Sequence, residues 1–142
     1  MGEEFSALVR SALKTAAATG ENQFPQCSLT GGDTLIIGEG AASVSLASAL
    51  ELSWGKPVRV LCPTECEKGI LREKDRLVTC EEEIEVALEN VSCVIADPLF
   101  RPIVPEGVRF ISLPAESFSG RIFREEIPNL ITGFESFAKE VL

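Results

Sequence analysis

Apolar residues along the chain gather in short unbroken runs that alternate with longer segments of mixed polarity. A short continuous run rich in Val, Ile and Leu is typical of a strand that is buried on both faces of a parallel sheet. This pattern predicts strands over residues 34–38, 58–61, 92–96 and 108–113. Residues 77–79 are expected to form a further short strand or an extended segment.

Segments with apolar residues at helical spacing lie between and around these runs. The spacing predicts helices over residues 3–18, 41–53, 81–90 and 128–141, and a weaker, charged helix over residues 64–73. Glutamates in the first turn of residues 81–90 favour that helix, because the helix dipole attracts negative charge there. Residues 98–105 contain several prolines and are expected to form a loop.

Strands that alternate with helices indicate a parallel sheet, because parallel strands need crossover connections. We therefore expect an α/β fold: a three-layer, Rossmann-like domain with a mostly parallel sheet of four to five strands and helices on both faces. An N-terminal helix and linker are expected over residues 1–32. The Rossmann-like domain is expected over residues 33–142, in a single globular domain overall.

The 142-residue chain carries a formal net charge of −9 and contains neither histidine nor tyrosine. Its residues cannot form a Ser-His-Asp or Cys-His centre, because both need an imidazole base. No other self-contained catalytic group stands out, and whether the protein is an enzyme stays open. A nucleic-acid partner is not expected, since phosphate contacts need clustered Lys and Arg. No apolar run is long enough to span a bilayer and no secretory signal is evident, so we expect no membrane association and a cytoplasmic location.

Candidate ligand-binding residues follow the predicted strands. In open parallel sheets, ligands bind beyond the carboxyl ends of the strands. Three of these ends supply the candidate cofactor-binding residues: Gly38, Glu39 and Gly40 after the first strand, Asp97 and Arg101 after the third, and Ser119, Gly120 and Arg121 after the fourth. The fourth end also carries a Pro-Ala-Glu-Ser run at residues 114–117, which would lie at the same edge of the sheet.

The run LIIGEGAAS at residues 35–43 begins like a nucleotide-binding motif, with a strand followed by Gly-x-Gly. Ser43 stands where the motif has its third glycine, and Glu39 adds negative charge to the turn. Cys62 stands near the position where an acidic residue would bind a ribose. These departures favour an ordinary strand-to-helix turn over dinucleotide binding, and they leave a nucleotide or flavin site as an alternative.

The chain has five cysteines, and in the absence of an export signal the expected state is free thiols in a reducing cytosol. Cys62 and Cys66 are four residues apart and would face the same way on one helical turn, which makes them candidate metal ligands. Together with Cys80 they are candidates for holding an iron–sulfur cluster. Cys93 lies within a predicted strand and is expected in the core. Unpaired structural thiols are the alternative that we favour.

A longer pattern covers most of the chain. It consists of IADPLFRPIVPEGVRFISLPAESFSGRIFREEIPNL at residues 95–130, with DTLIIGEGAASVSLASALE and VRVLCPTE upstream. This plan has a strand ending in Asp-Pro, a strand ending in Leu-Pro and then Phe-Ser-Gly-Arg. It resembles the C-terminal Rossmann-like domain of the nitrogenase component 1-type oxidoreductases. That family includes the subunits of the nitrogenase molybdenum–iron protein, their cofactor-assembly scaffolds and the light-independent protochlorophyllide reductase.

The resemblance implies three α/β domains of this kind in one chain, chains assembled in pairs, and metal clusters held between domains. Residues 33–130 resemble one of these three domains. No cluster ligand of the family can be assigned to a residue here, and nitrogenase activity is not implied. We therefore expect a nitrogenase component 1-like part of an oxidoreductase or metallocofactor-handling system, in which an iron–sulfur or other metal cluster would bind only with partner chains.

Two other functions stay open. One is a non-catalytic binding or assembly module, and the other is a stand-alone nucleotide or flavin binder that uses residues 38–43. A protein partner or a homo-oligomer is expected, and a small-molecule ligand would fit the residues at the strand ends.

Overall fold

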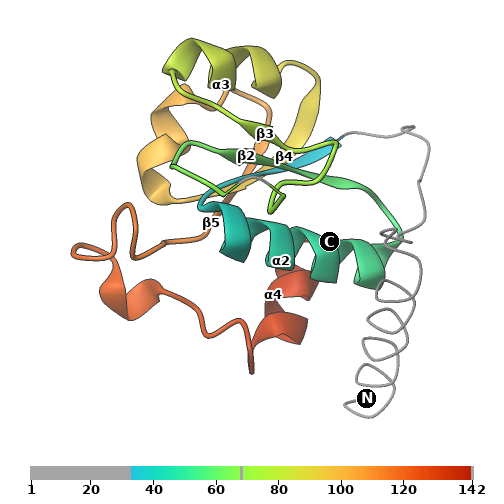
Figure 1. Cartoon of the computed structure of the whole chain (residues 1–142). Helices are drawn as coiled ribbons and strands as arrows, with labels where there is room; N and C mark the ends of the chain where they lie inside the picture. The colour runs from blue at the N-terminus through green and yellow to red at the C-terminus, as the bar shows by residue number, and fades with distance from the viewer. Residues whose placement is uncertain (1–32, 68, 142) are drawn as a thin grey trace.

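The computed structural model describes residues 33–67 and 69–141, which form a five-stranded sheet with helices on both faces (Figure 1). The strands are β1 (Asp33–Ile37), β2 (Val58–Cys62), β3 (Arg76–Leu77), β4 (Val91–Ala96) and β5 (Arg109–Ser112). Neighbours in the order β3-β2-β1-β4-β5 are all parallel, which confirms the expected α/β fold. The helix expected over residues 3–18 and the linker up to residue 32 lie outside the described residues.

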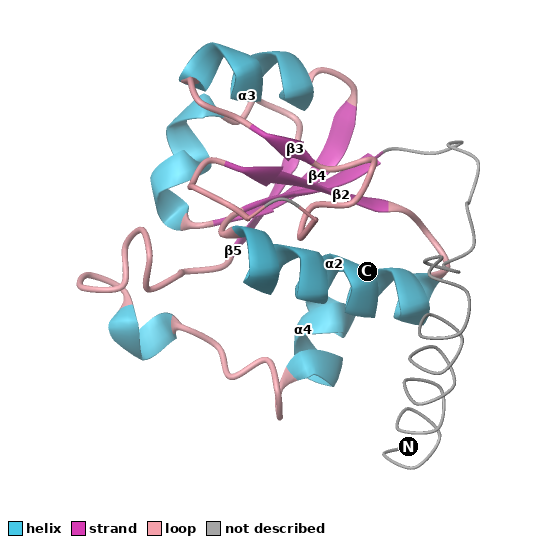
Figure 2. Ribbon diagram, in the orientation of Figure 1, coloured by secondary structure: helices cyan, strands magenta, loops and turns pink. Residues whose placement is uncertain are grey.

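Two layers of helix enclose the sheet (Figure 2). α2 (Gly40–Trp54) and α4 (Phe134–Val141) cover one face, and α3 (Glu81–Leu88) and the 3₁₀ helix η1 (Pro98–Ile103) cover the other. A second 3₁₀ helix, η2 (Arg124–Glu126), lies in the long segment before α4. Within the described ranges, every helix is too short or too polar to cross a membrane.

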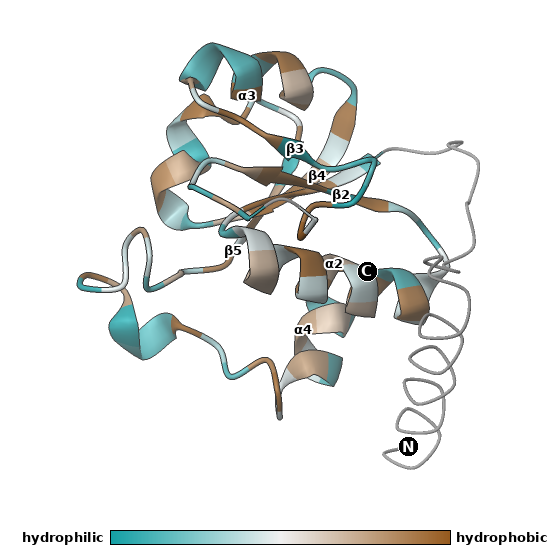
Figure 3. Cartoon of the chain, in the orientation of Figure 1, coloured by the Kyte–Doolittle hydropathy of each residue, from teal (hydrophilic) through white to brown (hydrophobic). Residues whose placement is uncertain are grey.

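Strand β1 explains why the predicted strands contain consecutive apolar residues rather than an alternation of apolar and polar ones. Ile36 packs with Leu50 in the cluster under α2, whereas Leu35 and Ile37 pack with Ile84 in the cluster under α3. All three β1 side chains are at most 2% exposed. Burying a side chain of this size contributes about 1.5–3 kcal/mol. In Figure 3 the strands are accordingly mostly brown, whereas much of α3 is teal.

Helix α2 matches the predicted helix over residues 41–53 to within a residue at each end. Ala47 is completely buried, and its small side chain lets the helix lie close to the sheet. The helix stops at Gly55, which has a φ of +66° and donates its N–H to the carbonyl of Glu51 at 2.8 Å. Glycine adopts this left-handed conformation at little cost, so it ends the helix cleanly.

Two helix predictions are wrong. The described residues of 64–73 form turns and irregular structure, with Gly69 at a φ of +97°. The helix expected over residues 128–141 begins only at Phe134. Ahead of it, the side-chain oxygen of Asn129 accepts hydrogen bonds from the N–H groups of Ile131 and Thr132, at 3.0 and 3.3 Å. Such a side-chain bond offers the backbone an alternative to the helix.

The loop expected over residues 98–105 also differs, because it contains η1. Oδ1 of Asp97 accepts a hydrogen bond from the N–H of Leu99 at 3.0 Å and so caps the first turn of η1. Pro98 stands at the start, where its missing N–H costs nothing. A capping residue followed by proline is a signal for the start of a helix, and here the helix that begins is the short 3₁₀ helix η1.

The segment after β2 is held by Arg72 and Asp75, which complete the outer edge of that strand. β3 pairs with only the last two residues of β2. Oδ1 of Asp75 instead accepts the N–H of Val60 at 2.9 Å, and Arg72 binds Asp75 through Nε at 2.7 Å and the carbonyl of Val58 at 2.8 Å. Glu51 of α2 accepts the N–H of Val58 at 2.7 Å and an Arg72 N–H at 2.9 Å. Side chains thus supply the hydrogen bonds that a longer β3 would make to β2, and the segment reaches them along an irregular path.

Candidate functional site

The described sheet has its topological switch point between β1 and β4. From β1 the chain crosses to β2 on one side, whereas from β4 it crosses to β5 on the other. In open parallel sheets a crevice opens at such a point, beyond the carboxyl ends of the strands. The loops after β1, β4 and β5 are therefore the expected place for a ligand.

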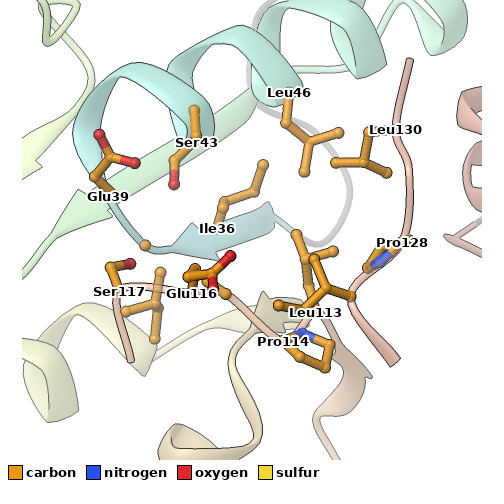
Figure 4. Close-up of a pocket in the computed structure, with 15 residues that line it drawn as sticks. Ile36, Glu39, Ser43, Leu46, Leu113, Pro114, Glu116, Ser117, Pro128 and Leu130 are labelled. Carbon is orange, nitrogen blue, oxygen red and sulfur yellow. The ribbon is translucent and has the colours of Figure 1, made fainter. Parts of the chain in front are cut away.

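A cleft of about 420 Å³ lies at this edge, on the face that α2 covers (Figure 4). One wall is the turn after β1 with the first turns of α2, and the other is the segment that follows β5. Ile127, Pro128 and Leu130 contribute a third side. Its apolar lining comes from Ile36, Leu46, Leu113, Pro114, Ile127, Pro128 and Leu130. A volume of this size suits a small organic molecule.

The polar groups of the cleft carry acidic charge. Glu39 lies at the start of α2 and Glu116 on the opposing loop, and both are exposed (Figure 4). Ser43 and Ser117 add hydroxyl groups from the same two walls. Among the described residues that line the cleft there is no Lys or Arg. The cleft therefore disfavours a phosphate and favours a neutral or cationic ligand.

Asp97 lies beneath the loops of the site rather than in its open part. It follows β4 and is only 1% exposed. Oδ1 accepts from Leu99, whereas Oδ2 accepts the N–H of Ala115 at 2.9 Å and the hydroxyl of Ser119 at 2.5 Å. Both oxygens are thus engaged within the chain, and the carboxylate positions the loop that forms one wall of the cleft. Its predicted part in cofactor binding stays a prediction.

The other predicted residues after β5 serve the same loop. Ser119 is 3% exposed and directs its hydroxyl at Asp97. Gly120 is buried, and a Cβ there would lie 2.6 Å from the Cα of Glu116. The backbone of the loop therefore closes on itself at a point where only glycine fits. Both residues hold Glu116 in place, and neither lines the cleft itself.

The two predicted arginines lie apart from the cleft. Arg101 is exposed on η1, with its guanidinium carbon 5.0 Å from the centre of the Phe110 ring. Such a cation–π contact is a structural use of the charge. Arg121 is exposed in the turn after Gly120. Neither side chain lines the cleft, so the structure does not bring these two candidate cofactor-binding residues to it.

The glycine turn after β1 is closed by its own neighbours. The N–H of Gly38 extends the β1–β2 ladder by donating to Leu61 at 3.0 Å, and a Cβ on Gly38 would lie 2.5 Å from Oγ of Ser43. The N–H of Ser43 is bonded to the carbonyl of Glu39 at 2.9 Å. Gly38 and Glu39 both line the cleft. With an acidic side chain and no cation here, the turn suits a strand-to-helix connection better than a phosphate cradle.

The structure brings Cys62 and Cys66 together and separates them from Cys80 and Cys93, while Cys27 lies outside the described residues. Cys62 ends β2 and is buried, while Cys66 is half-buried and faces Gly40. Cys80 is exposed at the start of α3, and Cys93 is buried in β4, as expected of a core residue. In the described part of the chain, no group of three or more His, Cys, Asp or Glu side chains is arranged to hold a metal ion. A cluster on Cys62 and Cys66 would need ligands from elsewhere.

A second cleft of about 430 Å³ lies on the opposite face, between the start of α3 and η1. It is lined mostly by apolar residues such as Ile84, Phe100 and Ile103, and its lining also includes Cys80 and Glu81. It stands apart from the turn after β1, so it lacks the convergence of strand ends that marks the first cleft.

Sequence reasoning finds one wall of the first cleft and misses another. Glu116 and Ser117 were placed at the correct edge by the position of the fourth strand. No local sequence pattern predicts that Ile127, Pro128 and Leu130 line the cleft. These residues come back to the sheet only after the long segment that contains η2. Pro128 was expected to begin a helix but lies in an irregular segment, and what that segment packs against is decided by the tertiary fold.

Comparisons with protein-family models, curated proteins and solved structures find no match to this chain. The fold and the geometry of the cleft are therefore the observations on which a function can be argued.

Proposed function

We propose that this domain binds a small, largely apolar molecule that carries a cationic or hydroxyl-bearing end, in the cleft beyond β1 and β5. The observation that supports this is the lining of the cleft: an apolar floor, two carboxylates and two hydroxyls, with no basic side chain among the described lining residues. Apolar area supplies the affinity of such sites, and a few polar groups orient the ligand. Here the polar groups select against anions.

The charges on opposing walls favour a ligand that spans the cleft. Glu39 and Glu116 come from different elements and both line the cleft, on opposite sides of it (Figure 4). An ammonium group between them would be stabilised by both, whereas a carboxylate or phosphate would be repelled by both. A nucleotide or flavin would place phosphate at this turn, so the alternative of a stand-alone nucleotide binder is the less favoured one.

The domain is proposed to work within a larger oxidoreductase or metallocofactor-handling system, in keeping with the resemblance to the nitrogenase component 1-type family. The segment that carries this resemblance most densely includes Asp97 and residues 113–121, which build and support one wall of the cleft. In this role the domain supplies a binding surface, while partner chains supply any metal ligands. The alternative function, a binding or assembly module without catalysis, would use the same surface.

The charge preference is tested with three ligands of one shape: cyclohexylmethylamine, cyclohexylmethanol and cyclohexanecarboxylate. The amine and the alcohol are expected to raise the thermal unfolding midpoint, and the carboxylate and inorganic phosphate are not. A ligand at 100 times its dissociation constant adds about 2.7 kcal/mol of stability. Stabilisation by ATP, NAD or FMN instead would overturn the proposal and favour the nucleotide binder.

Two neighbouring alanines provide a matched pair of variants. Ala41 and Ala42 are both exposed on the first turn of α2, and only Ala42 lines the cleft. Ala42→Leu is expected to abolish stabilisation by the amine, while Ala41→Leu retains it. Glu116→Gln should weaken the binding of the amine and leave the binding of the alcohol unchanged. Equal binding by the two leucine variants would place the ligand elsewhere.

Membership of a larger system is tested separately by native mass spectrometry of the full chain with the products of neighbouring genes. A stable complex, brown and iron-containing after anaerobic iron–sulfide reconstitution, is the expected result for a metallocofactor system. A complex that stays colourless and metal-free favours the assembly module, and the absence of any complex contradicts this part of the proposal.

A further inference from the structure

Two thiols converge on Gly40, where α2 begins. Cys62 is the last residue of β2, and Cys66 lies in the irregular segment that follows. Both sulfur atoms lie within 3.5 Å of the position that a Cβ on Gly40 would occupy, and Cys66 would overlap with it. The missing side chain of Gly40 therefore leaves a space into which both sulfurs project.

The two thiols also interact with one another. Burial raises the pKa of Cys66, and the neighbouring Cys62 raises it further, both by its charge and through a side-chain hydrogen bond. The thiol of Cys62 donates to the carbonyl of Thr64 at 3.3 Å, so it turns toward the segment that carries Cys66. Cys62 is completely buried, whereas Cys66 is reached by solvent. One thiol is therefore accessible and its partner lies behind it.

We propose that Cys62 and Cys66 are a redox-active pair that closes to an internal disulfide by exchange with a small-molecule disulfide. The thiolate of Cys66 attacks one sulfur of the disulfide, forming a mixed disulfide and releasing one thiol. The thiolate of Cys62 then attacks the sulfur of Cys66 and releases the second thiol. Two protein thiols are oxidised, the small disulfide is reduced by two electrons, and the two protons pass to the departing thiols.

The surroundings of Cys66 select the charge of the co-reactant. Glu39 directly precedes Gly40, against which the sulfur of Cys66 lies, and Glu67 directly follows Cys66 in the chain. Both carboxylates are exposed, and the negative charge of each acts on the thiol. An anionic disulfide is repelled from such a site, and a cationic one is attracted. The pair should therefore react faster with cystamine, which is cationic, than with glutathione disulfide, which is anionic. Added salt should reduce the difference.

The sequence provides a direct readout. Trypsin cleaves after Arg59 and Lys68, so Cys62 and Cys66 lie in one peptide, while Cys80 and Cys93 lie in another. The reduced full chain treated with cystamine should yield the peptide of residues 60–68 lighter by two hydrogen atoms. The exposed Cys80, by contrast, should carry a cysteamine adduct. A stable cysteamine adduct on Cys66 with no internal disulfide would overturn the proposal.

Single-thiol variants separate the two roles. Cys62→Ser should trap the mixed disulfide on Cys66, because the resolving thiol is gone. Cys66→Ser should leave the buried Cys62 unreacted in the folded chain. Rapid modification of Cys62 in the Cys66→Ser variant contradicts the proposed order of attack.

Two glycines of the same turn provide a further matched pair. In Gly40→Ala the new methyl group meets Sγ of Cys66, whereas in Gly38→Ala it meets the hydroxyl of Ser43. Gly40→Ala should slow disulfide closure by about tenfold or more, since overpacking has an effect of that order. Gly38→Ala should leave the rate near that of the parent chain. Circular dichroism verifies that both fold, and the Cys62→Ser result decides the proposal should Gly40→Ala fail to fold.

Discussion

The hydroxyl of Ser119 donates a hydrogen bond of 2.5 Å to Oδ2 of Asp97, although the two residues are 22 positions apart in the sequence. The same oxygen accepts the N–H of Ala115, and the other caps η1. One buried carboxylate thus joins the end of β4 to the loop after β5. Because that loop forms a wall of the cleft and carries Glu116, Asp97 helps to fix the position of Glu116.

We expect Asp97→Asn to lower the free energy of unfolding by about 1–3 kcal/mol, because an amide group leaves a buried donor without its acceptor. Ser119→Ala should cost less, since it removes a donor and leaves Asp97 with two backbone partners. Urea unfolding measures both. The matched control is Ser117→Ala, which changes an exposed hydroxyl and should stay within about 0.5 kcal/mol of the parent. A fully stable Asp97→Asn variant would contradict this account.

Breaking the Arg72–Asp75 pair should lower the free energy of unfolding by more than Asp97→Asn does. The Asp75 side chain is completely buried, and that of Arg72 is 11% exposed. Burial lowers the pKa of Arg72, but its bonds to Asp75 and the charge of Glu51 more than offset this, so the pKa ends above its ordinary value. Removing one partner of a buried pair costs about 3–5 kcal/mol, and we expect this of Arg72→Met in urea unfolding.

Lys74 is the control for that experiment. It also contacts Glu51, but its side chain is 37% exposed. Lys74→Ala should therefore change the free energy of unfolding by less than about 1 kcal/mol. Similar losses from Lys74→Ala and Arg72→Met would mean that burial does not distinguish the two pairs.

The pH dependence of thiol reactivity follows from the raised pKa of Cys66. Burial, Cys62, Glu39 and Glu67 all raise it above the ordinary thiol value of 9.0. The reactive form is the thiolate, so at a given pH below 9.0 alkylation of Cys66 by iodoacetamide should be slower than that of a free cysteine, and its rate should level off only at a higher pH. The folded state holds this proton more tightly than the unfolded one, so stability should fall as the pH rises through the raised pKa.

Neutralising the acidic neighbours of Cys66 should shift its alkylation profile. Glu39→Gln and Glu67→Gln each remove a charge that raises the pKa, so each should move the profile to lower pH. Glu65 precedes Cys66 directly but is not among the charges that act on it, and Glu65→Gln should leave the profile in place. An unchanged alkylation profile in Glu39→Gln would show that the charge of Glu39 does not affect the pKa of Cys66.

Arg109 of β5 predicts a local effect at the end of α4. One guanidinium N–H donates to the carbonyl of Val141 at 3.0 Å, and another donates to that of Glu140. These carbonyls have no partner within the helix, and a cation there also complements the helix dipole. Arg109→Met should raise amide hydrogen exchange over residues 137–141 and leave β1 protected. Lys139→Ala, in the same helix, should have little effect on exchange.

The strands were predictable because their signal is local. β2, β4 and β5 lie within two residues of the predicted runs, and β1 alternates between two cores as an unbroken apolar run requires. The helix expected over residues 64–73 is absent because Arg72 and Asp75 are engaged with the backbone of β2. Those contacts join residues 14 and 15 positions apart, and the periodicity of apolar residues carries no signal for them.

The amino-acid sequence by itself determined the class of fold and the absence of histidine, and it predicts a ligand at the carboxyl edge of the strands. Those properties follow from short-range apolar patterning and from residue types. Only the tertiary structure decided that Ser119 forms a hydrogen bond with Asp97. It also decided that Arg101 and Arg121 lie away from the cleft, and that the sulfur atoms of Cys62 and Cys66 both lie beside Gly40. The physical reason is that a side chain's role depends on which partners the folded chain brings within a few ångströms, and buried polar groups take whichever partners satisfy them.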